Sequence, residues 1–298
     1  MEAGLTLVLQ EHGVEIRRGA PLPVEALMLG RPVEEALELL PRLFNLCGTA
    51  QSLAFRLSLA LPVTQAPSLQ REILRDHVAK LCLSWPTLLG LPPLRLPRGW
   101  DAGGEAACQL LLGQATCPTD MTGLSDWMAR GQGVAPVIRS IAAELGEVRM
   151  SPHLAFTTPE TAMAKTAQEN SVAARRATDP MVLAAEVRWG RGPVWHAVAR
   201  LADALAVARG DLPAPVRLAD GTAVVPAARG GYALRAKSAA GRITAFERRA
   251  PTDHLVATGG SLEGLLAAMG KLAASQVRLL SDILDPCVTV LVQEGSHA

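Results

Sequence analysis

Aromatic residues and net charge are both scarce in this chain. Only 3% of its 298 residues are aromatic, and its acidic and basic residues leave a formal net charge of +1. A protein that binds nucleic acid electrostatically would show a basic patch and side chains that stack on bases. The composition therefore predicts no nucleic-acid partner.

Long apolar runs are missing as well. No run reaches the ~18–20 residues that a helix needs to cross a bilayer, and Met1-Glu2-Ala3-Gly4 lacks the layout of a secretory signal. Arg17-Arg18 leads into Gly-Ala-Pro, which differs from a twin-arginine signal. We expect no membrane span and a cytoplasmic location, where the five cysteines are reduced thiols.

The usual local motifs of catalytic and metal sites are also absent. The sequence has no C-x-x-C pair and no H-x-x-x-H or H-E-x-x-H arrangement, so a zinc, iron–sulfur or hydrolytic metal site has no local support. It also has no G-x-S-x-G, G-x-x-x-x-G-K or G-x-G-x-x-G segment. We expect a protein that is not an enzyme.

What the chain does have is a composition typical of helices. Apolar residues make up 49%, with Ala and Leu dominant. We predict a mainly α fold with a minor β part (α+β), forming one domain over residues 1–298. Its predicted parts are a hairpin (1–20), a helical region (21–210), a small β subdomain (215–256), and a C-terminal helix with a cysteine motif (260–290).

Hydrophobic periodicity and breaker residues locate the elements within these parts. Residues 5–9 and 14–17 form the hairpin strands, 91–103 form a loop, and four short strand-like runs fall within 215–256. Helices are predicted over 24–29, 32–42, 47–60, 68–90, 104–113, 122–130, 134–145, 159–168, 178–188, 193–209 and 262–284.

Two cysteines stand in positions that favour chemistry. Cys47 lies at the start of the predicted helix 47–60, where unpaired N–H groups and the helix dipole lower the pKa of a thiol. Cys287 follows Asp285-Pro286, just beyond a helix end. The alternative for each is a small buried apolar residue. Cys82 lies on the apolar stripe of a long helix and is predicted to belong to the core.

The remaining two cysteines, Cys108 and Cys117, flank a Leu-rich turn. We predict that they too are packing residues.

The contexts of Cys47 and Cys287 resemble the nickel-site motifs in the large subunit of NiFe hydrogenases. The segments are Arg42-Leu-Phe-Asn-Leu-Cys47-Gly-Thr-Ala50 and Asp285-Pro-Cys287-Val-Thr-Val290. In that family, R-x-C-G-x-C and D-P-C-x-x-C supply four thiolates. Here Ala50 and Val290 replace the second cysteine of each pair. The resemblance touches roughly residues 14–90 and 242–290.

Other family positions carry over in part. A family glutamate that acts in proton transfer precedes Gly-Arg, and Glu25 stands in that place before Gly30-Arg31, which implies a position near the site. The histidines that follow the two cysteine motifs fall on Ala54 and Gln293. The family's Ala-Pro-Arg-Gly, whose arginine contacts cyanide, falls on Ala250-Pro-Thr-Asp253.

The pattern of losses implies a function. In the family the first cysteine of each pair is a terminal nickel ligand and the second bridges nickel to iron. Without the bridging pair nickel is not expected, but Cys47 and Cys287 could hold one iron that carries cyanide and carbon monoxide, because soft thiolates suit it. The departure is similar to that of the accessory proteins called HupK or HoxV, which serve hydrogenase maturation.

The resemblance thus implies a scaffold or carrier that holds Fe(CN)2(CO) transiently. Its implied partners are small HypC-type chaperones and the hydrogenase large subunit. One alternative is a cofactor-free mimic that binds maturation chaperones by its large-subunit shape. Another is a degenerate oxidoreductase subunit that shares the ancestor, although retention of Cys47 and Cys287 disfavours it.

Overall fold

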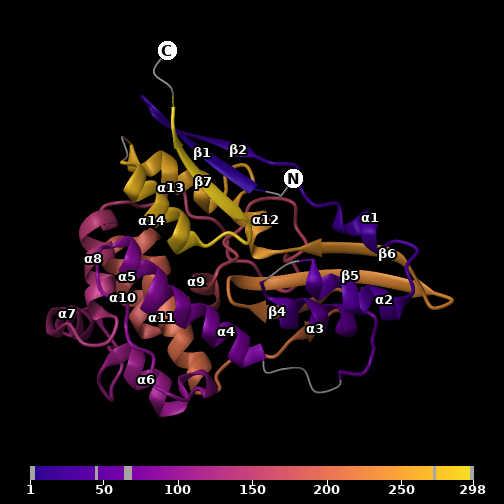
Figure 1. Ribbon diagram of the computed structural model, residues 1–298, viewed down its shortest axis with the longest axis horizontal. Helices are drawn as coiled ribbons and strands as arrows, with labels where there is room; N and C mark the ends of the chain where they lie inside the picture. Colours follow the sequence, from indigo (N-terminus) through magenta and orange to yellow (C-terminus); the bar gives the residue numbers. More distant parts are fainter. Residues whose placement is uncertain (1–3, 44–45, 64–68, 271–272, 296–298) are drawn as a thin grey trace.

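Helices form most of the regular secondary structure, and the strands gather in two separate sheets (Figure 1). The computed structural model describes residues 4–43, 46–63, 69–270 and 273–295. The helical elements are α1 (Val24–Met28), α2 (Val33–Leu39), the 3₁₀ turn η1 (Leu40–Arg42), α3 (Gly48–Ser58), α4 (Leu69–Val78), the π-helical turn η2 (Ala79–Ser84), α5 (Trp85–Leu88), η3 (Trp100–Ala102), α6 (Gly104–Leu112), α7 (Met121–Arg130), α8 (Ala135–Leu145), α9 (Val172–Arg175), α10 (Pro180–Trp189), α11 (Pro193–Ala208), α12 (Pro251–Leu255), α13 (Ser261–Met269) and α14 (Ala274–Leu284). The strands are β1 (Gly4–Gln10), β2 (Gly13–Arg18), β3 (Val216–Arg217), β4 (Ala223–Ala227), β5 (Gly230–Ala239), β6 (Arg242–Arg249) and β7 (Thr289–Glu294).

The first sheet joins the two ends of the described chain. Its strand order is β2-β1-β7, with the hairpin β1–β2 antiparallel and β7 parallel to β1. The register places Leu5 opposite Val290. Because β7 follows α14 closely, this pairing fixes the segment that carries Cys287 against the N-terminal hairpin.

The second sheet is an antiparallel meander with the order β3-β4-β5-β6. Helices α1, α2 and α3 pack against it (Figure 1). Its strands β4 and β5 turn through residues 228–229, and Gly230 has φ +148° with its Cα close to Asn170. A Cβ at Gly230 would lie 2.4 Å from the Asn170 carbonyl oxygen, so only glycine fits this approach.

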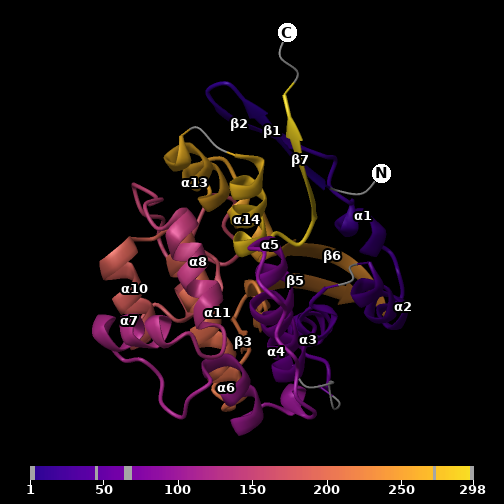
Figure 2. The same ribbon diagram turned by 60° about the vertical axis from the view of Figure 1, so that its left-hand side comes forward.

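Two hydrophobic cores hold the fold together. The first core surrounds α11, whose residues are almost all buried, as expected of a helix at the centre of a bundle. Helices α4, α6, α8, α9, α10 and α14 pack around it (Figure 2). The second core lies between the β4–β6 sheet and α1–α3.

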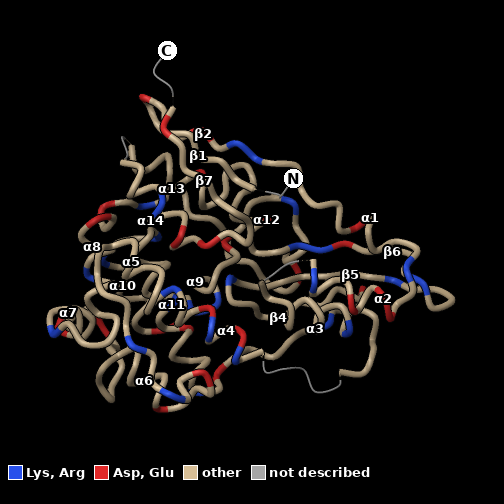
Figure 3. The backbone as a smooth tube through the Cα atoms, in the orientation of Figure 1, with Lys and Arg blue, Asp and Glu red and all other residues tan. Residues whose placement is uncertain are grey.

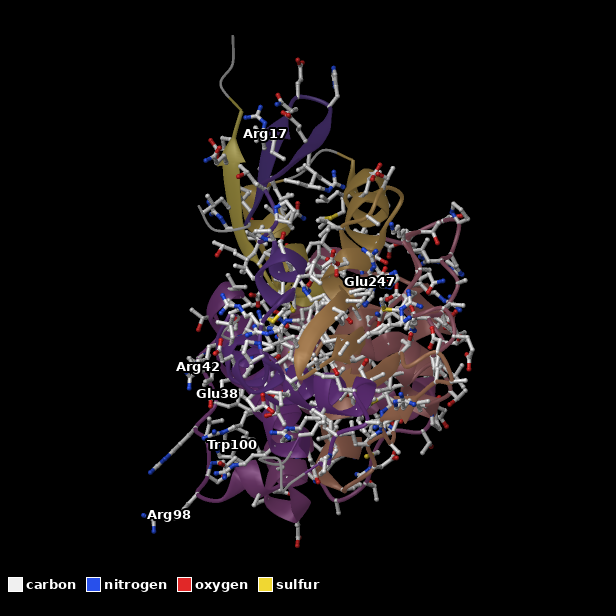
Figure 4. The ribbon with its side chains drawn as sticks, turned by 90° about the vertical axis from the view of Figure 1, so that its right-hand side faces the viewer. Arg17, Glu38, Arg42, Arg98, Trp100 and Glu247 are labelled. Carbon is white, nitrogen blue, oxygen red and sulfur yellow. The ribbon has the colours of Figure 1, made fainter. Side chains whose placement is uncertain are left out.

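The predicted fold class is confirmed, and most predicted elements are present. The predicted helix 68–90 appears as α4, η2 and α5, with a π-helical turn in the middle, although residue 68 lies outside the described residues. The loop 91–103 contains only η3, and Arg98 projects from it into solvent (Figure 4). Within the described part of the chain, no helix has the length and apolar character to cross a membrane.

The structure corrects three predictions. Residues 159–168 form turns and no helix, because the Thr161 hydroxyl bonds to the Thr158 carbonyl and to Gln168, which competes with helical pairing. The predicted helix 262–284 is two helices, α13 and α14, since Gly270 adopts φ +67°; residues 271–272 lie outside the described part. The predicted β region 215–256 ends in a helix, α12, and the C-terminal motif continues into the unpredicted strand β7.

Candidate functional site

Cys47 lies at the junction of the two cores. It packs against both of them, immediately before α3. Its backbone is left-handed, with φ 58° and ψ 30°, a conformation uncommon for a residue with a side chain. Such local strain persists where the surrounding structure imposes it, and it is found often at functional sites. Phe44 and Asn45 of the quoted motif lie outside the described residues.

A carboxylate caps the helix that Cys47 precedes. Glu72 of α4 accepts hydrogen bonds from the backbone N–H of Thr49 at 2.8 Å and of Ala50 at 3.3 Å. The Cys47 thiol makes no capping bond. The free N–H groups that were expected to stabilise a Cys47 thiolate are therefore already paired with a negative charge.

Cys287 is held from the opposite end of the chain. Helix α14 ends at Asp285, which has φ 53°, and Pro286 prevents the helix from continuing. The backbone N–H of Cys287 then donates to the Thr252 hydroxyl of α12 at 2.7 Å. The segment is thereby fixed on both sides of the thiol, between α14 and β7.

The two thiols are hydrogen-bonded to one another. This bond lowers the pKa of Cys287 from 9.0 to about 7, and it raises the pKa of Cys47 well above 9.0 together with burial. Of the two thiols, Cys287 is therefore the one that loses its proton more readily. The sequence prediction of a lowered pKa at Cys47 is wrong, because the hydrogen bond with Cys287 and burial both raise the pKa of this thiol.

Arg229 supplies the positive charge beside the pair. It comes from the turn between β4 and β5, and its side chain is 5% exposed. One guanidinium nitrogen lies 3.6 Å from the Cys47 sulfur and 3.0 Å from Asp76. Its positive charge also contributes to lowering the pKa of Cys287.

A network of buried charges holds Arg229 in place. Asp285 accepts from Arg229 at 3.1 Å, from Arg200 at 3.1 Å and from Lys80 at 3.0 Å. Burial alone would raise the pKa of Asp285, but these three cations keep it below its usual value. Asp76 bridges Arg229 and Arg200.

Acidic and basic residues are interspersed along the described chain, including the centre of the molecule (Figure 3).

The network continues into the first core. Arg200 contacts the Nδ1 atom of His77 at 3.4 Å, and His77 Nε2 lies 2.7 Å from Asp203. Arg175 and Arg176 also pair with Asp203. Burial favours the neutral form and lowers the pKa of His77. A buried carboxylate needs several polar partners, and Asp203 has three, namely His77, Arg175 and Arg176.

The remaining family-like positions lie on three elements, α3, β7 and α1. Ala50 and Ala54 are fully buried on α3, so the places of the second cysteine and first histidine are filled by methyl groups. Val290 is half-buried and Gln293 exposed on β7. Glu25 is exposed on α1, and among the described residues no hydrogen bond joins it to either thiol, so its role near the site stays a prediction.

The motif matching in the sequence did not identify Arg229 as a residue of the site. Matching Ala-Pro-Arg-Gly to Ala250-Pro-Thr-Asp253 places a threonine at the arginine position. The structure instead brings the arginine of Ala227-Ala-Arg229-Gly230 beside Cys47. That Ala-x-Arg-Gly spacing was the available signal. The 250–253 segment has another role, because its Thr252 binds the Cys287 backbone.

Among the described residues, no hydrogen bond joins the other three cysteines to Cys47 or Cys287. Cys82 is fully buried in the first core, as predicted, and burial raises its pKa to about 12. Cys108 and Cys117 are half-buried and pack against the same core, which also agrees with their predicted role. Arg209 contacts these last two thiols.

Two adjacent thiols next to a guanidinium suit a soft, electron-rich metal unit. Among the described residues, no group of three or more His, Cys, Asp or Glu side chains could hold a metal ion. The thiols that could hold such a unit are those of Cys47 and Cys287, and Arg229 lies beside Cys47 to balance the charge. Two thiolates do not by themselves complete the four-sulfur set of a nickel–iron centre.

Comparison with solved structures shows the fold. The chain is similar to a variant of the NiFeSe hydrogenase from Desulfovibrio vulgaris Hildenborough, with a TM-score of 0.55 and 14% identity, over 96% of this chain and 99% of that chain. It is also similar to the reduced NiFeSe hydrogenase from Desulfomicrobium baculatum, with a TM-score of 0.55 and 12% identity, over 94% and 95% of the two chains. These likenesses confirm the predicted large-subunit-like fold.

Comparison of sequences gives the family. No family model matches the chain. It is 37% identical over 82 residues to the hydrogenase expression/formation protein HoxV of Cupriavidus necator, covering 25% of this chain and 21% of that protein. It is 49% identical over 305 residues to the hydrogenase expression/formation protein HupK of Rhodobacter capsulatus, covering 100% of both. The chain belongs to the HupK family of hydrogenase expression/formation proteins.

Proposed function

We propose that this protein acts in hydrogenase maturation as a scaffold or carrier for the Fe(CN)2(CO) unit, bound by Cys47 and Cys287. The names of its relatives support a role in hydrogenase formation. The observation that carries the proposal is the hydrogen bond between two thiols from opposite ends of the chain. The role is that of a non-catalytic accessory protein.

The protonation of the pair supports its use as a ligand set. A thiol must lose its proton to bind a metal. Cys287 has a pKa of about 7, so close to neutral pH much of it is already thiolate. Binding then requires only the proton of Cys47 to leave, and Arg229, 3.6 Å from the Cys47 sulfur, offsets the added negative charge.

The missing ligands support a transient cargo without nickel. Ala50 presents a methyl group where the family has a bridging cysteine, and Val290 likewise presents only methyl groups on β7. Two protein anchors release iron more readily than four. The cargo would therefore pass from the carrier to a large subunit, or arrive from a small HypC-type chaperone, without formation of a stable binuclear centre here.

The test is infrared spectroscopy of the protein purified without oxygen from cells that contain the whole maturation system. Cyanide and carbonyl stretching bands in the wild type, lost in Cys47→Ser and in Cys287→Ser, are the expected result. Cys82→Ser is the matched control and should keep the bands, because Cys82 lies in the core. Bands that persist in both site variants would overturn the ligand assignment.

The cofactor-free mimic is a second candidate. It is favoured by the large-subunit-like fold over nearly the whole chain combined with the loss of half of the ligands. If it were correct, the purified protein would show no cyanide or carbonyl bands and would still bind a HypC-type chaperone in a pull-down. Cys47→Ser and Cys287→Ser would then bind the chaperone and support maturation as the wild type does.

A further inference from the structure

We propose that Cys108, Cys117 and Arg209 form a second thiol site, in which peroxide converts the two cysteines into a reversible disulfide. Helix α6, which carries Cys108, lies at the end of the molecule away from the β2-β1-β7 sheet in both ribbon views (Figures 1 and 2). The site is therefore distinct from Cys47 and Cys287.

Three separate segments bring these residues together. Cys108 is on α6, Cys117 is in the connection from α6 to α7, and Arg209 is the C-cap of α11. The connection is held close to the bundle at Gly113, whose φ is +66° and where a Cβ would lie 2.8 Å from the Gly133 nitrogen. Cys117 is thereby returned toward α6.

The Arg209 guanidinium contacts both thiols. Its Nη2 atom donates to the Cys117 sulfur at 2.8 Å, and its guanidinium also hydrogen-bonds to Cys108. Among the described residues Arg209 has no ion pair with a carboxylate, so the sulfur atoms are its polar side-chain partners. The guanidinium therefore holds the Cys117 sulfur at a defined place next to Cys108.

Exposure permits the reaction as well. Both cysteines are half-buried and Arg209 is exposed, so a small oxidant reaches the site from solvent. Cys82, by contrast, is fully buried, and burial raises its pKa to about 12, which makes it unreactive. The chain thus contains an internal control for thiol reactivity.

The oxidant is a hydroperoxide, and hydrogen peroxide is its simplest member. The Cys117 thiolate attacks one peroxide oxygen, an S–O bond forms, the O–O bond breaks, and hydroxide leaves and takes up a proton as water. The sulfur of Cys108 then attacks the resulting sulfenic acid, its proton departs with the hydroxyl as a second water, and the S–S bond forms. Both cysteines are oxidised and peroxide is reduced to two waters.

The test uses the full-length Cys47→Ala/Cys287→Ala variant, in which Cys82, Cys108 and Cys117 remain. After hydrogen peroxide treatment we expect the intact mass to fall by two hydrogen atoms. Peptide mapping without reductant should show a Cys108–Cys117 link, and dithiothreitol should reverse both changes. In Cys108→Ser, dimedone should label Cys117, because the sulfenic acid has no resolving thiol.

Arg209→Met tests the role of the guanidinium. We expect slower disulfide formation, because methionine cannot hydrogen-bond to the Cys117 sulfur and hold it beside Cys108. Arg209→Lys keeps the charge and should react faster than Arg209→Met. An unchanged rate in Arg209→Met, or a treated protein in which Cys108 and Cys117 both remain open to alkylation, would overturn the proposal. So would over-oxidation of Cys117 without any disulfide.

Discussion

The thiols of Cys47 and Cys287 form one hydrogen-bonded pair, although Cys47 precedes α3 near the start of the chain and Cys287 follows α14 near its end. Their pKa values move in opposite directions, because one proton and one negative charge are shared between two sulfur atoms. The pair lies between the two cores, since Cys47 packs against both. Loss of either sulfur therefore removes the partner that shifts the pKa of the other.

Cys47→Ser and Cys287→Ser should each abolish maturation of the partner hydrogenase while the protein remains folded. Serine is nearly isosteric with cysteine, but its hydroxyl is a harder and much less acidic ligand. Hydrogenase activity in extracts measures the loss, and circular dichroism checks the fold. Cys82→Ser should behave differently, with full maturation and a free energy of unfolding lower by about 1–3 kcal/mol, because it buries a hydroxyl.

If all three variants mature the hydrogenase normally, the two thiols do not carry cargo. The cofactor-free mimic would then replace the carrier as the proposed function.

The alkylation rate of Cys287 should depend on pH with a midpoint near its pKa of about 7. The thiolate is the reactive form, so the rate falls as pH drops below the midpoint and levels off above it. Cys47→Ala removes the hydrogen bond that lowers this pKa, and the midpoint should move to higher pH. Iodoacetamide labelling followed by peptide mass spectrometry measures both profiles.

A Cys287 profile that is the same with and without Cys47 would contradict the shared hydrogen bond. Thr252→Val serves as a comparison, because the Thr252 hydroxyl also lowers the pKa of Cys287. Its effect on the midpoint should have the same sign and a smaller size.

Arg229→Met should destabilise the protein by about 3–5 kcal/mol, the range for removal of one partner from a buried ion pair. In this variant Asp285 still has Arg200 and Lys80 as ion-pair partners. Within the described part of the chain, Asp76 is left with Arg200 alone. Urea unfolding measures the change. In the folded fraction the Cys287 alkylation midpoint should also rise, since Arg229 lowers that pKa.

Arg229→Lys is the matched control for charge. Lysine keeps the positive charge, but it cannot reach Cys47, Asp76 and Asp285 together with one planar group. Its stability should fall between those of the wild type and Arg229→Met. Equal stability of Arg229→Met and the wild type would show that the network contributes little.

Glu72→Ala should lower the free energy of unfolding by about 1 kcal/mol, a value typical of a lost helix cap. The change leaves the N–H groups of Thr49 and Ala50 without the carboxylate they now contact. It should also raise the alkylation rate of Cys47, because it frees two backbone N–H groups at the helix start beside the thiol. Urea unfolding and pH-dependent alkylation of Cys47 measure the two effects.

Glu72→Gln separates these contributions. The amide oxygen can still accept one of the two bonds, so its stability should lie closer to that of the wild type. If Glu72→Ala and Glu72→Gln leave both stability and Cys47 reactivity unchanged, Glu72 is not the cap of α3.

Elements that depend on local pattern could be predicted from the sequence. The apolar stripe that includes Ile73, Leu74 and Cys82 specified a long buried helix, and the turn at Gly13 specified the hairpin. The motifs around Cys47 and Cys287 identified the two thiols as one candidate site. These features depend on residues that are neighbours along the chain, so periodicity and motif spacing are enough to find them.

The charges around the two thiols and the pKa shifts of the thiols depend on contacts that form only in the folded protein. Arg229, Asp76 and Glu72 come from the β4–β5 turn and α4, and no local spacing relates them to Cys47. Strand β7 exists because β1 offers it an edge far away in sequence. The pKa of a thiol depends on every charge and hydrogen bond that folding brings to it, and this is why the pKa is lowered at Cys287 and raised at Cys47.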